Sequence, residues 1–372
     1  MKILYVVPDL VVGGVSTVVL NNIKELQQRG CLIKLVTMKT ILEPKKYNEL
    51  NFASLNINSS KDVFKALMEF NRIVRNFKPD IIHSHTYYAN MFIRAYSMIY
   101  RNRIVKICNE HGTYRKDVNS IYWFLFKITR KVPDYFINVS QSSLMSYVDN
   151  GLCDKRNCAV LYNGIALGDF KKNEELIIKL RNKYSLSSED IVFGYVGRLS
   201  KEKDVINLLQ AINILKNLSK ECFKLIVVGD GPERDGLIDF VNTHKLDDII
   251  VFVGEKSDVV PYFSIIDILV LPSKTEGLPT VLLEAMAMEC MIVSTNCGGV
   301  EEILSGTKSY IVPIESPYEL AYKMNEVLDL DSETRKRYGK DYRNTIISAF
   351  SIEHTVNKIY SLYSRILYKD NL

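Results

Sequence analysis

The stretch that decides the fold reads SKTEGLPTVLLEAMAMECMIVSTNCGG, from Ser273 to Gly299. The apolar run 267–271 lies before it and ends at Pro272, and a proline with a glycine nearby marks a strand that ends in a loop. Pro279 suits the first turn of a helix, where its missing N–H is not needed. We therefore expect a helix over about 280–288, and the apolar run after it is the next strand.

Two carboxylates flank the start of this helix. Glu276 falls in the loop before it, and Glu284 lies about a turn and a half inside. Free N–H groups and the helix dipole favour an anion at the helix N-terminus. Carboxylates cannot bind that anion, but they can accept hydrogen bonds from hydroxyls. Either glutamate alone would be a solvated surface residue, whereas the pair describes a site for a phosphate flanked by hydroxyl-rich groups, as in a nucleotide-sugar.

The loop Glu-Gly-Leu-Pro, followed by a helical glutamate, resembles the GT-B glycosyltransferases of family 4. Glu276 and Glu284 meet the E-x7-E signature of that family, and the resemblance extends over nearly the whole chain. It implies an α/β fold with two Rossmann-like doubly wound domains that face a cleft. It also implies an enzyme that transfers a sugar from a nucleotide-sugar with retention of the anomeric configuration.

Length and composition fit this class. A chain of 372 residues is long enough for two domains, and 47% apolar with 24% charged residues is typical of a soluble globular protein. No apolar run approaches the roughly 18 residues that span a bilayer, and the apolar segment 1–7 is too short for a signal peptide. The seven cysteines are odd in number and form no CxxC pair, which favours reduced thiols in the cytosol over disulfides or a zinc site.

The charge is unevenly distributed along the chain. Residues 1–165 include 23 basic and 12 acidic residues, a net charge of +11, while residues 166–372 include 25 basic and 31 acidic residues, a net charge of −6. A basic half implies an anionic partner such as a phosphate-bearing acceptor, an anionic membrane surface or nucleic acid. No nucleic-acid-binding module is recognisable, so we expect no nucleic-acid partner. The resemblance implies a nucleotide-sugar donor and a glycan or lipid-linked acceptor as partners, and the basic half adds an anionic membrane surface.

The N-terminal residues start the first doubly wound sheet. A strand over 2–7, a glycine pair and a helix over about 17–29 lead to a second strand. Gly13 and Gly14 could let the backbone approach a phosphate, or form a plain tight turn. In the family this loop faces the donor diphosphate across the cleft and continues with Glu-Arg. Here Val15 follows instead, which leaves the loop's contacts to the acceptor open.

Polar residues follow two later strands at their carboxyl ends. One strand ends with His83 and His85, and the next is followed by Glu110 and His111. Ligands of open α/β sheets sit at the carboxyl ends of strands, so these are candidate cleft residues. Structural, hydrogen-bonded histidines are the alternative for His83 and His85. A zinc site of His83, His85 and His111 is a further alternative, although it lacks a clear fourth ligand.

Aromatic and basic residues are interleaved in two stretches, 94–106 and 122–131. Packed helices with solvated charges would produce this pattern, and so would a peripheral contact with a membrane. Both interpretations stay open, for different residues.

The domain joint is expected in the polar stretch 166–189, because the Asn-Gly-Ile step just before it resembles the family's entry into the linker. We assign 1–168, with an amphipathic tail helix at about 354–372, to an acceptor- and membrane-facing domain. Residues 169–353 are expected to bind the nucleotide-sugar. In the first domain, residues 40–60 are polar and poorly periodic, and we expect a loop there.

Arg198 and Lys203 follow the first strand of the second domain. At that spacing two cations could lie over one phosphate pair. The alternative is surface charge at a helix start, which the helix dipole disfavours. In the family the pattern G-R-L-x-x-x-K, met by Gly197 to Lys203, holds the donor diphosphate. Lys201 lies outside the pattern and is expected to be solvated.

The resemblance assigns roles to individual residues. Glu284 would bind the ribose hydroxyls, Glu276 the sugar, and the backbone near Gly254 the base. His111 stands before a glycine, as does the family's histidine near the donor sugar, which implies polar contact and charge stabilisation. The residues assigned to catalysis are His111, Arg198, Lys203 and Glu276. The residues assigned to the donor are Gly13, Gly14, Gly197, Arg198, Lys203, Gly254, Glu255, Lys256, Glu276, Gly277, Leu278, Pro279, Thr280 and Glu284. The residues expected on the acceptor side are Val15, His85, Glu110 and Tyr114.

The resemblance implies a hexosyl- or N-acetylhexosaminyltransferase, with a UDP-sugar preferred over a GDP-sugar, that acts on a hydroxyl of a glycan or lipid-linked acceptor in cell-surface polysaccharide synthesis. We expect a cytoplasmic enzyme, peripheral at the inner face of the membrane. No metal and no cofactor are expected, because Arg198, Lys203 and helix N-termini can take the leaving-group charge. The alternatives are a nucleotide-sugar epimerase of similar fold and a non-catalytic partner of an active glycosyltransferase.

Overall fold

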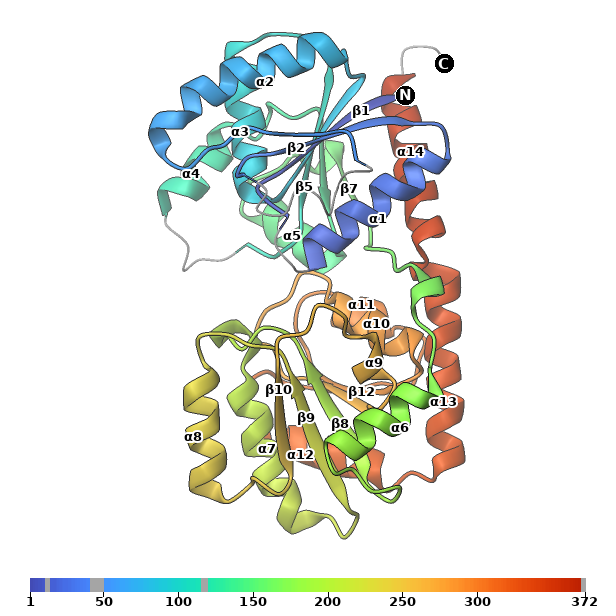
Figure 1. Ribbon diagram of the computed structural model, residues 1–372. Coiled ribbons are helices and arrows are strands. Elements are labelled where there is room, and N and C mark those ends of the chain that lie inside the picture. The colour runs from blue at the N-terminus through green and yellow to red at the C-terminus, as the bar shows by residue number, and fades with distance from the viewer. Residues whose placement is uncertain (11–13, 41–49, 115–119, 369–372) are drawn as a thin grey trace. The chain divides into compact units, whose positions relative to one another are not determined.

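The computed structural model describes residues 1–10, 14–40, 50–114 and 120–368 (Figure 1). The chain divides into two compact units: unit 1 is Met1–Gly164 with Ile352–Leu372, and unit 2 is Ile165–Ser351. The sequence predicted the two crossings between the domains after residues 168 and 353, a few residues later than the structure has them. The chain enters and leaves unit 2 at adjacent points, because the Ile165 N–H donates to the Phe350 carbonyl at 2.9 Å.

Unit 1 is built on a seven-stranded parallel sheet with the order β3-β2-β1-β4-β5-β6-β7. Its central strands carry almost continuous apolar residues, as expected for strands that are covered on both faces. The strands are β1 (Lys2–Val7), β2 (Leu32–Thr37), β3 (Phe52–Ser54), β4 (Ile81–His85), β5 (Val105–Glu110), β6 (Tyr135–Asn138) and β7 (Cys158–Val160). The sequence predicted a loop over 40–60, and this prediction missed β3. This strand is short and half-buried at the edge of the sheet, and its pairing with β2 defines it as a strand.

Helices cover both faces of this sheet. Phe70, Phe92 and Tyr96 from α2 and α3 pack edge-to-face on one side, and α1 and α14 lie side by side on the other (Figure 1). The helices of unit 1 are α1 (Gly14–Gln28), α2 (Val63–Phe77), α3 (Thr86–Ile99), α4 (Ser120–Ile128), α5 (Gln141–Asp149) and α14 (Ile352–Leu367), with short 3₁₀ turns η2 (Ser60–Asp62) and η3 (Lys155–Asn157). Helix α1 begins three residues before the predicted start at Thr17.

Unit 2 repeats the plan with a six-stranded parallel sheet of order β10-β9-β8-β11-β12-β13. Its strands are β8 (Ile191–Val196), β9 (Phe223–Val228), β10 (Ile250–Gly254), β11 (Ile268–Leu271), β12 (Met291–Thr295) and β13 (Tyr310–Val312). The strand order reverses direction between β8 and β11, which are paired. Such a switch point is where open α/β sheets bind ligands, at the carboxyl ends of the strands.

The helices of unit 2 flank this sheet on both faces (Figure 1). They are α6 (Glu174–Lys183), α7 (Val205–Leu218), α8 (Arg234–His244), α9 (Val260–Phe263), α10 (Thr280–Ala287), α11 (Val300–Leu304), α12 (Pro317–Leu328) and α13 (Ser332–Thr345), with 3₁₀ turns η4 (Leu167–Asp169) and η5 (Lys201–Lys203) and a π-helical segment η6 (Ile346–Phe350). Helix α10 occupies the predicted range to within one residue.

Two further features bear on the protein's setting. All seven cysteines carry free thiols. Across the described ranges, no helix combines the length and the apolar character that crossing a bilayer requires.

Candidate active site

The loops after β8 and β9 are locked together at the carboxyl edge of the unit 2 sheet. The Leu199 N–H donates to the Asp230 carbonyl at 2.9 Å. Gly229 has a φ of +141°, and a Cβ there would lie 1.8 Å from the Gly197 carbonyl oxygen, so only glycine permits this approach. The packed backbone leaves Arg198 with an exposed side chain, which makes no hydrogen bond or ion pair with another described residue. Its guanidinium is therefore open to an anion.

Lys203 and Glu276 meet at the same edge. The Lys203 Nζ donates to Glu276 Oε1 at 2.6 Å, and Ser273 Oγ donates to the same oxygen at 2.7 Å. Lys203 belongs to η5 and Glu276 to the loop after β11, and the Lys274 N–H joins the two segments by donating to the Glu202 carbonyl at 2.9 Å. The two assigned residues thus form one cluster across the switch point.

The loop after β12 holds the Glu276 loop in place. Thr295 Oγ1 donates to the Ser273 carbonyl at 2.6 Å, and the Gly299 N–H donates to the Gly277 carbonyl at 2.9 Å. Gly298 has a φ of +55°, and a Cβ on it would lie 2.2 Å from the Glu276 carbonyl oxygen. A side chain at that position would displace the residue that pairs with Lys203.

Helix α10 begins directly after this loop. Pro279 stands at its N-cap, its first turn contains no acidic residue, and no described side chain caps its N–H groups. These N–H groups favour an anion. Glu284 lies half-buried on the same helix, and this burial raises the pKa of its carboxyl to about 7. A carboxylate that is poorly solvated gains from hydroxyl donors.

The segment expected to line the base slot lies at the end of β10. The Gly254 carbonyl accepts a hydrogen bond from the Gly229 N–H at 3.0 Å, so this segment is joined to the β9 loop. Glu255 is exposed. Lys256 turns back on its own strand, because its Nζ donates to the Val253 carbonyl at 3.1 Å.

In unit 1, His111 is paired with His85. The His85 Nδ1 and His111 Nε2 lie 3.0 Å apart, and the Asn109 amide nitrogen lies 3.4 Å from the same His85 Nδ1. Burial lowers the pKa of His111 to about 4 and lowers that of His85 well below its usual value. Both imidazoles are therefore neutral near pH 7. His111 offers hydrogen bonding to a substrate, but it does not supply the positive charge that stabilisation of an anion would use.

His83 has a structural environment. Its Nδ1 lies 2.5 Å from the Tyr363 hydroxyl of α14, which lies 3.0 Å from the Tyr5 hydroxyl. Burial lowers the pKa of His83 to about 3. Within the described ranges, no three His, Cys, Asp or Glu side chains are arranged to hold a metal ion. His83 is therefore a structural, hydrogen-bonded histidine. His83, His85 and His111 do not form the zinc site considered in the sequence analysis.

Two residues assigned to the acceptor side pack against other residues of unit 1, Glu110 almost completely and Tyr114 in part. Glu110 is 5% exposed and accepts a hydrogen bond from Asn90 at 2.7 Å, and burial raises its pKa to about 7. Glu110 does not follow the strand as predicted, because it is the last residue of β5, whose last five residues are all buried. The Tyr114 ring packs edge-to-face on Trp123 at 4.8 Å. His85 has no exposed surface, and its imidazole contacts His111.

The glycine loop is described in part. Gly13 lies outside the described residues, and Gly14 is the first residue of α1. Gly14 and Val15 line a cavity of about 350 Å³ at the ends of β1 and β4, together with Thr86. This is the switch point of the unit 1 sheet, where strand order reverses. Val15 was expected on the acceptor side, and its contact with an acceptor stays a prediction.

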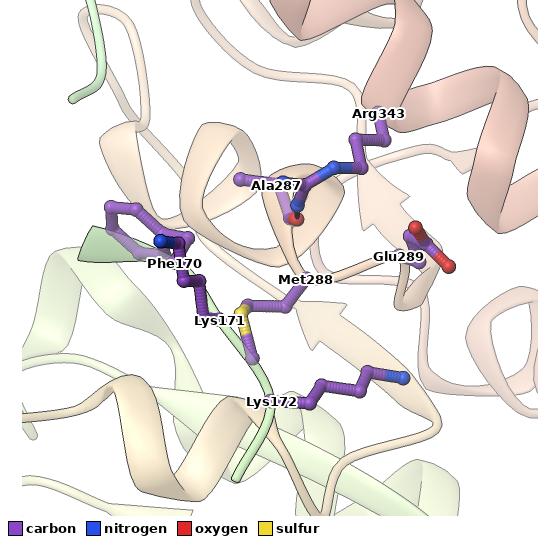
Figure 2. A pocket seen from close by; sticks show the side chains of 7 residues that line it. All are labelled: Phe170, Lys171, Lys172, Ala287, Met288, Glu289 and Arg343. Carbon is purple, nitrogen blue, oxygen red and sulfur yellow. Dashed lines mark hydrogen bonds between the residues drawn. The ribbon is translucent and has the colours of Figure 1, made fainter. Parts of the chain in front are cut away.

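A second cavity, of about 290 Å³, is lined by Ala287, Met288 and Glu289, just before the amino end of β12 and not at the carboxyl ends of the strands (Figure 2). Figure 2 shows the Arg343 guanidinium at the Ala287 carbonyl, to which it donates a hydrogen bond. Ala287 ends α10, and a cation at a helix C-terminus neutralises the dipole. This is the end of α10 opposite to the Glu276 loop, so the cavity is separate from the candidate site.

Several residues that organise the site were not identified from sequence. Ser273 follows Pro272, which ends the predicted strand 267–271, and this position at the start of the Glu276 loop was a usable signal. Thr295, Asn90, Asn109 and Tyr363 bond to partners far away in the chain, and no local pattern marks such partners.

Comparisons with known proteins place this geometry in a family. The family model "Glycosyltransferase Family 4" matches residues 12–168, and "Glycosyl transferases group 1" matches residues 177–345. The capsular polysaccharide biosynthesis glycosyltransferase CapM of Staphylococcus aureus is 25% identical over 82% of this chain and 81% of its own length. UDP-Gal:alpha-D-GlcNAc-diphosphoundecaprenol alpha-1,3-galactosyltransferase of Escherichia coli is 25% identical over 83% and 81%.

Solved structures show the same fold. A glycosyltransferase from Rickettsia africae has a TM-score of 0.86 at 21% identity and covers 98% of both chains. Anabaena HepE, solved in complex with UDP, has a TM-score of 0.84 at 19% identity and covers 98% of this chain and 100% of its own; HepE was also solved with UDP-glucose. With family models over both units, the chain is a glycosyltransferase of the GT-B fold and belongs to glycosyltransferase family 4.

Proposed function

We propose that unit 2 binds a UDP-sugar and that the enzyme transfers its hexose or N-acetylhexosamine, with retention, to a hydroxyl of a glycan or lipid-linked acceptor. The observation that carries the proposal is the contact of Lys203 with Glu276 at 2.6 Å. The contact brings together, at one strand edge, a cation that can bind a phosphate and a carboxylate that can accept hydrogen bonds from hydroxyls. Exposed Arg198 at the end of β8 adds a second cation for the diphosphate.

The roles follow from charge and hydrogen bonding. Arg198, Lys203 and the N-terminal amides of α10 would hold the diphosphate. Glu276 would accept a hydrogen bond from a sugar hydroxyl, and Glu284 from the ribose. Because Lys203 also contacts Glu276, it can fix the distance between diphosphate and sugar.

In the reaction the bond between the anomeric carbon and the β-phosphate oxygen breaks, and the acceptor hydroxyl oxygen bonds to the same carbon. The hydroxyl proton passes to the departing phosphate. Attack from the face of the leaving group would retain the configuration, and we assign no residue as a covalent nucleophile. The charge on the nucleoside diphosphate would fall on Arg198, Lys203 and the α10 N-terminus, so the proposed step uses no metal and no cofactor. His111 would contribute a neutral hydrogen bond to the transferred sugar.

The names of similar proteins support the proposed substrates. The Escherichia coli relative is named for UDP-galactose and a diphosphoundecaprenol-linked acceptor, and CapM for capsular polysaccharide. HepE was solved with UDP and with UDP-glucose. The seven free thiols suit a reducing compartment, and we propose a cytoplasmic enzyme that works at the inner face of the membrane.

The test is a thermal-shift screen over nucleotide-sugars, followed by NMR of the product anomer. A specific donor raises the unfolding midpoint by mass action, and the product should keep the anomeric configuration of the donor. An inverted product would refute the retaining mechanism. Donor consumption without any acceptor would favour the epimerase, and a Lys203→Ala strain with unchanged surface glycan would favour the non-catalytic partner.

A further inference from the structure

Helix α4 carries apolar residues on two opposite faces. Its inner face includes Phe126, which is fully buried among aromatic rings. Its outer residues recur with the spacing i, i+3, i+4 and i+7. These are Ile121, Phe124, Leu125 and Ile128, exposed by 62%, 62%, 38% and 58%. A surface helix of a soluble protein normally turns polar residues outward, so this outer stripe is unusual.

Polar contacts on the inner side of α4 hold the stripe outward. The Arg94 side chain of α3, 1% exposed, donates to the Phe126 carbonyl at 2.7 Å and to Thr129 Oγ1 at 3.1 Å. Its guanidinium also lies 3.6 Å from the centre of the Phe126 ring. The Tyr87 hydroxyl donates to the Tyr122 carbonyl at 3.0 Å. Helix α4 is therefore fastened to α3 along its inner side (Figure 1) and cannot rotate its outer stripe inward.

The charge around this helix is strongly positive. Residues 120–133, which are α4 and the segment after it, include three Lys or Arg and no Asp or Glu, a net charge of +3. The three cations, Lys127, Arg130 and Lys131, are all exposed. An apolar stripe with cations beside it is complementary to an anionic lipid bilayer, in which apolar acyl chains lie beneath negatively charged headgroups.

The structure also separates the two aromatic and basic stretches of the sequence. In the stretch 94–106, Arg94, Tyr96 and Lys106 are buried, so these residues belong to the core. In the stretch 122–131 the aromatic and basic residues are mostly exposed. Arg101 and Arg103 of the first stretch are exposed, but its aromatic residues are not. The second stretch exposes both kinds of residue, so the inference concerns that stretch.

We propose that α4 lies in the headgroup region of an anionic bilayer, with its outer stripe against the acyl chains and Lys127, Arg130 and Lys131 against lipid phosphates. The inference rests on the proposed function for its biological setting, since a lipid-linked acceptor is held at such a surface. Vesicle binding is measured without donor or acceptor. A protein that transfers sugar but does not bind vesicles would contradict this inference alone, and one that binds vesicles but does not transfer sugar would contradict the proposed function alone.

The chain offers its own reporter, because Trp123 of α4 is its single tryptophan. Full-length protein is mixed with vesicles of phosphatidylcholine containing about 30 mol% phosphatidylglycerol, and with pure phosphatidylcholine vesicles. We expect sedimentation with the anionic vesicles, weakening with salt. We also expect quenching of Trp123 emission when the lipids are brominated near the headgroup.

The test variant is Phe124→Gln with Ile128→Gln, which removes two exposed apolar groups and should lower the vesicle partition at least about tenfold. Its control is Ile178→Gln on α6, where the native side chain is 61% exposed. A second variant, Lys127→Gln with Lys131→Gln, should lower binding to anionic vesicles about fivefold per cation and leave any binding to pure phosphatidylcholine unchanged.

Three outcomes would overturn the inference. One is an absence of binding to anionic vesicles. Another is binding without Trp123 quenching, or binding that the Phe124→Gln, Ile128→Gln variant keeps, since a different surface would then be responsible. The third is a wild-type dimer in analytical ultracentrifugation that this variant dissociates, because the stripe would then cover a second copy of the chain. The thermal midpoint of each variant should match the wild type, because the replaced side chains are exposed.

Discussion

Lys203 donates a hydrogen bond to Glu276 over 2.6 Å, although 73 residues separate the two in the chain. The Glu276 side chain is 9% exposed and that of Lys203 25%, so the pair is only partly solvated. Ser273 bonds to the same oxygen, Oε1, and in the described part of the chain Oε2 receives no hydrogen bond. With Oε1 engaged by Lys203 and Ser273, Oε2 is left to accept a hydrogen bond from a hydroxyl.

Replacing Lys203 should therefore impair both binding and stability. We expect Lys203→Ala to lower kcat/KM at least about 100-fold, because a cation at the leaving group is lost. It should also lower the free energy of unfolding by about 2 kcal/mol, because Glu276 loses its charged partner in a half-buried position. Steady-state kinetics and urea denaturation measure the two effects.

Lys201 provides the matched control, because it is exposed in the same 3₁₀ turn. Lys201→Ala should change kcat/KM less than about threefold and stability by less than about 0.5 kcal/mol. Equal effects at the two lysines would show that general positive charge, and not the Glu276 contact, matters here.

Arg198 should affect donor binding without affecting the fold. Its side chain is exposed and free of partners among the described residues, so Arg198→Ala should leave the thermal midpoint of the unliganded protein unchanged. UDP should stabilise the wild type more than uridine does, since the phosphates supply the contact. In the variant this difference should disappear. A variant that still distinguishes UDP from uridine would place the diphosphate elsewhere.

Glu284 should couple stability to pH. Its carboxyl pKa is raised to about 7 in the folded protein by burial, so the folded state binds a proton more tightly than the unfolded state does. The stability from this proton is complete below the unfolded pKa and is lost as pH rises through 7. Glu284→Gln should therefore be more stable than the wild type at about pH 8, by about 2 kcal/mol, with a smaller difference at about pH 5.

Donor affinity should show the opposite trend at this residue. The ionised carboxylate accepts hydroxyl hydrogen bonds, so wild-type affinity should rise as pH increases through about 7. Glu284→Gln should bind more weakly and lose this dependence. Isothermal titration calorimetry of donor binding at two pH values measures this dependence. If the variant kept the wild-type pH dependence, a group other than Glu284 would be responsible for it.

Gly298 should be required for the Glu276 loop. Its φ is +55° and a Cβ would lie 2.2 Å from the Glu276 carbonyl oxygen. Gly298→Ala should lower stability by about 2 kcal/mol through strain and overlap, and should raise the donor KM by displacing Glu276. Gly236→Ala in α8 is the control, since a Cβ there meets nothing within 4 Å; it should be neutral or stabilising by about 0.5 kcal/mol. Circular dichroism melts and donor titration distinguish the two.

His111 should act as a neutral group. Its pKa is lowered to about 4 by burial, so the kcat profile should show no ionisation of an ordinary histidine near neutral pH. His111→Asn should lower kcat about 100-fold without changing the shape of the profile, whereas exposed His244→Gln should leave kcat unchanged. An acidic limb in the wild type that disappears in His111→Asn would mean that His111 is charged during turnover.

The sequence by itself determined the α/β class and the ends of α10, because apolar runs, Pro279 and Gly277 act over a few neighbouring residues. It also identified Arg198, Lys203 and Glu276 as one motif set through resemblance, and left open whether they meet. Tertiary structure decided that Lys203 and Glu276 touch, because strand pairing between β8 and β11 joins segments far apart in sequence. It decided that Glu110 turns into the core and that His111 is neutral, because burial depends on packing from every side. The strand β3 escaped prediction for the same reason, since only the partner strand β2 makes it a strand.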